Sequence, residues 1–255
     1  MPIDRMPDDW RERLNAQLQS WRENFPDCQC YALIDGAQQP ALLASLRRLQ
    51  LAHAAVFASW GVSDPETLAL SPLLVPYSAA QHASWLKIIA SLDGLPATSL
   101  VLTPEPVEQL AARWSPWCRI DAAGQPLLLR FSDTRILPEL LALLEPMQQS
   151  SFLGPTRVLL TMDRRGQWRS LVTTPSDTPI AIEVSLDESQ CAGLVRAAEP
   201  DETLAQLAIT SPQVVARHQP STAYQTVQHV LLTADRDGVT LFGERSARCL
   251  AALNS

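Results

Sequence analysis

The sequence predicts a mixed α/β lobe of residues 1–178 followed by a smaller all-helical lobe of residues 179–255. In the first part, short apolar segments with strand character alternate with segments of helical periodicity, which is typical of a mixed sheet flanked by helices. After TTPSDTP at 173–179 only helical segments follow, and all seven tryptophans lie in the first two thirds of the chain. We therefore expect parallel crossovers as well as antiparallel hairpins in the first lobe.

The first lobe is expected to open with a helix, DDWRERLNAQLQSWREN at 8–24. Trp10, Leu14, Leu18 and Trp21 recur at spacings of three and four, so they share one face of that helix. Strands are predicted at residues 28–36, 53–59, 71–78, 98–103, 117–121, 126–131, 157–163 and 168–174. Further helices are predicted at residues 40–51, 79–92, 104–114, 134–144 and 146–155.

Turn-forming residues define how these strands are connected. Gly124 lies in the turn of a predicted hairpin at 117–131, and residues 164–167 form the turn of a second hairpin at 157–174. Two prolines within 71–78 favour an edge or terminal position for that strand, because proline lacks the backbone donor that a central strand needs.

The second lobe is expected to contain helices alone. Ser185 and Glu188 form a capping-box pattern, so the first helix is predicted to begin at Ser185. Helical segments are predicted at residues 185–199, 201–218, 222–237 and 239–254. A break is expected near Ser211-Pro212, because proline removes a helical hydrogen bond.

Composition disfavours several classes of protein. The chain has 255 residues, 46% of them hydrophobic, which is enough to bury a sizeable core. Its net charge is -7, and no basic cluster could follow a phosphate backbone, so nucleic-acid binding is disfavoured. The apolar runs are far shorter than the ~20 residues of a membrane span. With no secretory signal in the sequence, we expect a cytoplasmic protein that binds no membrane.

The sequence predicts neither a metal site nor a cofactor. Cys28 and Cys30 are separated by one residue, whereas a zinc-binding CxxC pair is separated by two. The odd number of cysteines favours free, buried thiols. Neither an HExxH motif, a glycine-rich phosphate loop nor a GxSxG nucleophile motif is present.

One polar cluster has two interpretations. The stretch LLLRFSDTRILPELL at 127–141 places Arg130, Asp133 and Arg135 directly after a strand of apolar residues that is expected to be buried. Asp35 ends an earlier strand, as active-site acids in α/β folds often do. The four residues could centre a small hydrolase or an anion-binding enzyme. They could also form a structural clamp that fixes a strand end to a helix start, which is favoured because buried acid–base pairs are commoner as structure.

Several segments follow one another in a familiar order: YALIDGA (31–37), LLVPYS (73–78), LVLTPEPVEQL (100–110), LLLRFSDTRIL (127–137) and FLGP (152–155). In this order they resemble the adaptor and chaperone family of bacterial type VI secretion, the domain of unknown function 4123 family. Ser132 stands where the family usually has tyrosine, Thr134 where it has proline, and Leu153 where it has a second phenylalanine. The arginines and the aspartate of the family motif are all present.

The resemblance implies a non-enzymatic function. Members of this family bind a secretion effector, often near its N-terminal region or its PAAR domain, and load it onto the trimeric spike protein VgrG. They stay in the cytoplasm and are not secreted. The expected partners are therefore an effector and VgrG.

A chaperone that covers an apolar segment of its cargo needs an apolar groove, and we expect the helical lobe to supply it. The predicted cargo-binding residues are Leu204, Leu207, Val214, Val215, Val230, Leu231, Leu232, Leu241 and Phe242. The alternative is that most of these residues form the core of the lobe.

Overall fold

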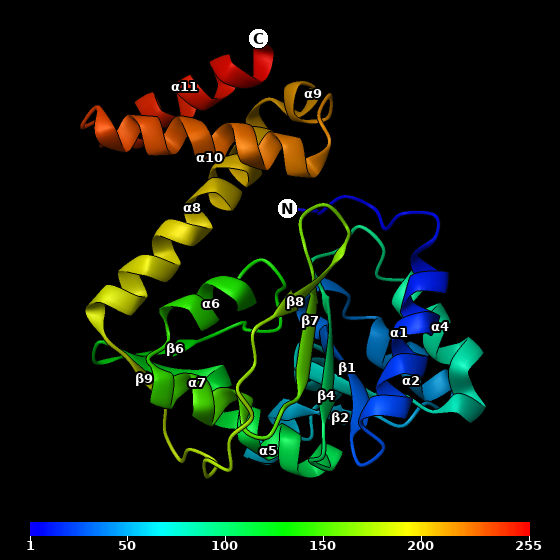
Figure 1. The fold of residues 1–255 in the computed structure, drawn as a ribbon. Helices are drawn as coiled ribbons and strands as arrows, with labels where there is room; N and C mark the ends of the chain where they lie inside the picture. Colours follow the sequence, from blue (N-terminus) through cyan, green and yellow to red (C-terminus); the bar gives the residue numbers. More distant parts are fainter.

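The computed structural model describes residues 1–255 and confirms the predicted fold class (Figure 1). The large sheet has six strands in the order β2 (Ala54–Ala55), β3 (Pro72–Pro76), β1 (Gln29–Asp35), β4 (Thr98–Thr103), β7 (Val158–Met162) and β8 (Trp168–Leu171). The small sheet has the order β6 (Gln125–Leu128), β5 (Arg119–Ala122) and β9 (Ser185–Leu186). Pairing is antiparallel throughout the large sheet, so the expectation of parallel crossovers within residues 1–178 is wrong. The one parallel pair is β5 with β9.

Helices cover both faces of the large sheet. Side chains of its central strands point alternately to the two faces, so each face contributes to a separate core. Ala32 and Ile34 of β1 pack with helices α1 (Trp10–Asn24), α2 (Leu42–Arg48) and α4 (His82–Ala90). Tyr31 and Leu33 point to the opposite face, where α5 (Val107–Cys118), α6 (Leu137–Leu143) and α7 (Pro146–Leu153) lie. β1 is therefore buried on both faces, although all its neighbours are antiparallel.

The prediction of a strand at 53–59 is wrong for most of its length. β2 has only two residues, and the chain then forms a 3-10 helix at Val56–Trp60 that ends at Gly61 with φ +76°. β2 takes the edge position beside β3, so β3 is second from the edge in spite of its two prolines. The short helix α3 (Pro65–Ala69) connects this region to β3.

The helical lobe consists of α8 (Glu188–Thr210), α9 (Pro212–Val215), α10 (Pro220–Arg236) and α11 (Phe242–Asn254). The capping prediction is wrong by two residues: Asp187 caps α8 and forms a capping box with Gln190. Ser185 belongs to β9 instead, where it pairs with Asp121. The predicted break near residue 211 is present, but α8 continues through Pro200 as one helix of 23 residues.

Helix α8 connects the two lobes (Figure 1). Its first half packs against α6, where Gly193 meets the side chain of Leu143, and its second half packs against α10 and α9. Residues 179–186 lie before α8, and the β9 part of this segment pairs with β5. Figure 1 shows α10 and α11 extending well away from the large sheet.

Candidate functional site

The four residues of the predicted clamp lie together where β1 ends and α6 begins. Asp35 is the last residue of β1, and its Oδ2 accepts a hydrogen bond from Arg130 Nη2 at 2.7 Å. Nε and Nη2 of Arg135 donate to the two carboxylate oxygens of Asp133 at 2.9 and 2.6 Å. Arg130 Nη2 also lies 4.0 Å from Asp133 Oδ2, which joins the two pairs. The four side chains form one network, and their contribution to stability stays a prediction.

Both carboxylates of this network already have several donors. Asp35 Oδ1 accepts from the backbone N–H of Ala37 at 3.1 Å. Asp133 accepts from the backbone N–H of Arg135 at 3.0 Å and from the side chain of Gln38 at 3.4 Å. Burial raises the pKa of Asp35 above its ordinary value, and the neighbouring guanidinium offsets part of this rise. With exposures of 1% and 3%, these two carboxylates are poorly placed to meet a substrate.

The network continues into the helical lobe through Asp201 of α8. Arg135 Nη1 donates to Asp201 Oδ1 at 3.2 Å, and Arg164 reaches both Asp201 oxygens at 3.1 and 2.7 Å. The Arg164 guanidinium also lies 3.4 Å from the ring centroid of Tyr224 on α10. The sequence reasoning did not find Asp201, since 66 residues separate it from Arg135 and no local spacing relates them. The network of the predicted clamp therefore contacts the helical lobe as well as a strand end.

The predicted cargo-binding residues divide into three groups. Buried members of the helical core are Leu204, Leu207, Val215 and Leu231. Val214 and Val230 are half-buried and pack against that core. Leu232, Leu241 and Phe242 are exposed, with exposed fractions of 47%, 71% and 58%. Leu241 and Phe242 adjoin at the turn between α10 and α11, so they are the neighbouring apolar pair that a partner can reach.

A cleft of about 320 Å³ lies between the lobes and is bounded by α6, α8 and α10. Its apolar side chains are Ala142, Leu143, Ala197, Pro200, Leu231 and Leu232, and its charged ones are Glu139, Arg196, Glu199 and Asp235. Leu231 and Leu232 are thus the two predicted cargo residues that the cleft contains. The cleft exists only because α8 holds α10 at a distance from α6, and this arrangement has no local signal in the sequence.

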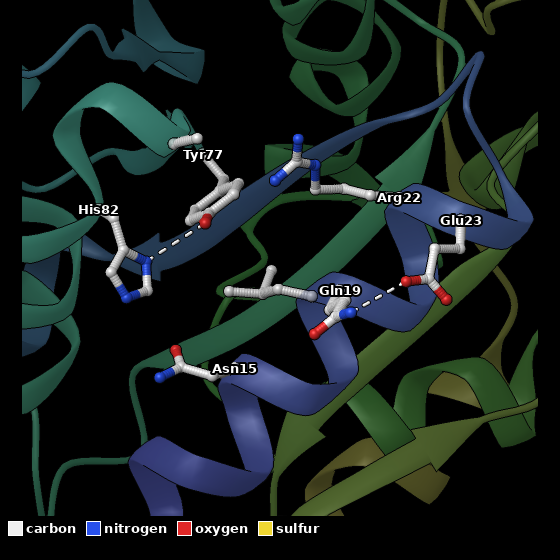
Figure 2. A pocket seen from close by; sticks show the side chains of 8 residues that line it. Asn15, Gln19, Arg22, Glu23, Tyr77 and His82 are labelled. Atoms are coloured by element: carbon white, nitrogen blue, oxygen red, sulfur yellow. Dashed lines mark hydrogen bonds between the residues drawn. The ribbon is translucent and has the colours of Figure 1, made fainter.

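A second hollow lies elsewhere, between α1 and the end of β3, and has a volume of about 650 Å³. Figure 2 shows Arg22 and Gln19 of α1 facing Tyr77 and His82 across it. The Tyr77 hydroxyl and His82 Nδ1 are 3.2 Å apart, and Gln19 donates to Glu23 at 3.0 Å. It is an open depression without a serine or cysteine nucleophile, and none of the predicted site residues lines it.

A comparison with protein families found a match over the central part of the chain. Residues 30–151 match the family described as Domain of unknown function (DUF4123). The DUF4123 match begins in β1, ends in α7 and contains all four clamp residues. Helices α8–α11, with Asp201 and every predicted cargo residue, follow the matched segment. No curated protein and no solved structure matches the chain.

No group of three or more histidine, cysteine, aspartate or glutamate side chains is arranged to hold a metal ion. None of the helices combines the length and the hydrophobicity that a membrane-crossing segment requires.

The five cysteines are free, and their burial predicts how they react with thiol reagents. Burial raises the pKa of Cys30 to about 12 and that of Cys249 to about 11, and it also raises the pKa of Cys118. These three thiols therefore carry almost no thiolate near pH 8. In the native protein we expect slow reaction with Ellman's reagent at Cys28 and Cys191 alone, and reaction of all five after denaturation. Fast titration of three or more native thiols would contradict the burial of Cys30, Cys118 and Cys249.

Proposed function

We propose that this chain is a non-enzymatic adaptor that binds a type VI secretion effector in the cytoplasm and loads it onto the spike protein VgrG. The observation that carries the proposal is the DUF4123 match over residues 30–151, together with the family resemblance of the same segments. The clamp favours this function over a hydrolase centred on Asp35 and Arg130, because its carboxylates are buried and already hydrogen-bonded.

The helical lobe is the proposed site of effector binding. It lies outside the DUF4123 match, as expected of a region whose sequence varies with the effector that it binds. Two of its features support the proposal: the exposed pair Leu241 and Phe242, and the cleft between α6, α8 and α10. An amphipathic effector segment, from the N-terminal region or next to a PAAR domain, would place apolar side chains on these surfaces.

The test is co-purification with type VI secretion effectors and with VgrG proteins of the same organism. The wild-type chain should capture both, and a Leu241→Ser/Phe242→Ser variant should bind the effector about tenfold more weakly, as expected when exposed apolar anchors are removed. Because both side chains are exposed, the variant should keep the wild-type melting temperature.

Met147→Ser is the matched control, since Met147 is also exposed (71%) but lies on α7 of the α/β lobe. If both variants capture the effector equally poorly, the turn between α10 and α11 is not part of the effector-binding site. A wild-type chain that captures neither the effector nor VgrG would contradict the adaptor function itself.

A further inference from the structure

Strand β6 is exposed along its whole length, so the expectation of a buried strand is wrong for Leu127 and Leu128, although Phe131 beyond its end is buried. All four residues of Gln125–Leu128 are exposed, with exposed fractions of 54% for Leu127 and 69% for Leu128. Adjacent residues of a strand point to opposite faces, so β6 presents an apolar side chain on each face. Two adjacent exposed leucines on one strand indicate an interaction surface.

β6 also has a free hydrogen-bonding edge. It is the outer strand of the order β6-β5-β9, and the N–H of Leu129 donates to the Cys118 carbonyl at 2.9 Å, toward β5. Backbone groups alternate in direction along a strand. The Pro126 carbonyl, the N–H and carbonyl of Leu128, and the Arg130 N–H therefore point away from β5. Proline has no N–H, so the edge offers a run of donors and acceptors only from the Pro126 carbonyl to the Arg130 N–H.

Apolar and charged side chains lie beside this edge, and the charged ones that line the neighbouring hollow are Arg119, Asp121 and Glu183. Trp60 (38% exposed) and Ile182 (93% exposed) line a hollow of about 540 Å³ on the outer face of the small sheet, beside Pro116 and Pro126. Leu128 pairs with Arg119, which is exposed, has no ion-pair partner in the structure and shares this outer face.

The charges nearest the edge differ between its two ends. The side chain of Arg130 is half exposed even though it contacts Asp35, so the Leu128–Arg130 end is basic. Asp121 lies opposite Pro126, at the turn end, where its carboxylate accepts from the Gly124 N–H at 2.6 Å. Arg119, which has no ion-pair partner, therefore supplies the positive charge of the free part of the edge, whereas the charge of Arg130 is largely balanced by Asp35.

We infer that β6 binds an extended segment of a partner protein, which adds as a short strand along Leu128–Arg130. The segment carries apolar side chains that cover Leu127 and Leu128, and an acidic side chain that meets Arg119 or Arg130. A second copy of this chain fits the edge less well, because self-pairing would place four arginines around a contact too short for the ~1,200 Å² of a stable interface. This inference stands apart from effector binding by the helical lobe.

The test is selection of peptides from a phage-displayed library of random decamers on the purified full-length chain. We expect the selected peptides to alternate apolar and acidic residues. We also expect Leu128→Pro to weaken their binding at least about tenfold, because it removes the outward N–H that the added strand needs. The same change should spare the β5–β6 pairing, as Pro126 already does two residues earlier.

Two further variants separate backbone pairing from side-chain contact. Leu128→Ser keeps the N–H, so it should weaken peptide binding less than Leu128→Pro. Val172→Ser, at a residue away from β6 that is even more exposed (91%), should have no effect. Hydrogen exchange of residues 125–131 should slow when a selected peptide is bound.

Three results would overturn the inference. The first is selection of no peptides, and the second is peptides that bind Leu128→Pro as tightly as the wild type. The third is a dimer in light scattering that Leu128→Pro dissociates, since the occupant of the edge would then be a second copy of the chain.

Discussion

Replacing Asp133 with alanine is expected to lower the free energy of unfolding by about 3–5 kcal/mol, as happens when one partner of a buried ion pair is removed. The Asp133 side chain is 4% exposed and that of Arg135 is 12% exposed, so the change leaves a guanidinium with little access to water. Asp201 remains as a second partner of Arg135 at 3.2 Å, which places the expected loss toward the lower end of that range. Urea unfolding followed by circular dichroism measures the loss.

Asp9→Ala is the matched control, because the Asp9–Arg13 ion pair is 45% and 62% exposed and should contribute only about 0–1 kcal/mol. A loss below about 1 kcal/mol for Asp133→Ala would contradict the clamp. Effector capture should fall only where the variant is unfolded. A fully folded Asp133→Ala variant that fails to capture the effector, or that has lost a measurable turnover, would instead make Asp133 a functional residue.

Replacing Glu105 with alanine should destabilise the protein by a similar amount, about 3–5 kcal/mol. Glu105 and Arg113 form an ion pair in which each side chain is 5% exposed, and Arg113 Nη2 lies 2.7 Å from Glu105 Oε1. Arg113 Nη1 also donates to the carbonyls of Ser151 and Thr178 at 3.1 Å each. Gly154 packs against the guanidinium, and a side chain there would collide with it. The pair therefore connects α5 to α7 and to the segment that leads toward the helical lobe.

A double variant, Glu105→Leu with Arg113→Met, separates the cost of an unpaired charge from that of the pair itself. It removes both charges, so we expect it to recover much of the stability lost in Glu105→Ala. The carbonyls of Ser151 and Thr178 would remain without their donor, at a cost of about 1–3 kcal/mol for each that finds no water. A double variant that is less stable than Glu105→Ala would show that the unpaired carbonyls and the packing, and not the buried charge, dominate the loss.

Most of the α/β lobe could be predicted from local patterns. Trp10, Leu14, Leu18 and Trp21 share a face, and α1 buries the last three of these against the sheet. Both predicted hairpins are present, since turn residues and strand residues act over only a few positions. The arginines and the aspartate at 130–135 could be recognised as a polar network for the same reason.

The sequence predictions were wrong where the secondary structure or burial of a residue depends on residues that are distant in sequence. Ser185 begins a capping-box pattern, but it pairs with Asp121 in a strand, so the residue that caps α8 is Asp187. Val56 is apolar and buried, yet it lies in a 3-10 helix because β2 pairs with β3 over only two residues. The leucines of β6 are exposed because that strand is at a sheet edge, a position that its own residues do not reveal.

The sequence by itself determined the fold class, most helices and strands, and the resemblance on which the proposed adaptor function rests. These depend on periodicity, turn residues and ordered motifs, all of which are local or sequential properties. Only the tertiary structure decided that Asp201 joins the clamp, that four of the predicted cargo residues are core, and that β6 is free. Burial and ion pairing depend on which surfaces meet when the chain folds, and residues far apart in sequence decide that together.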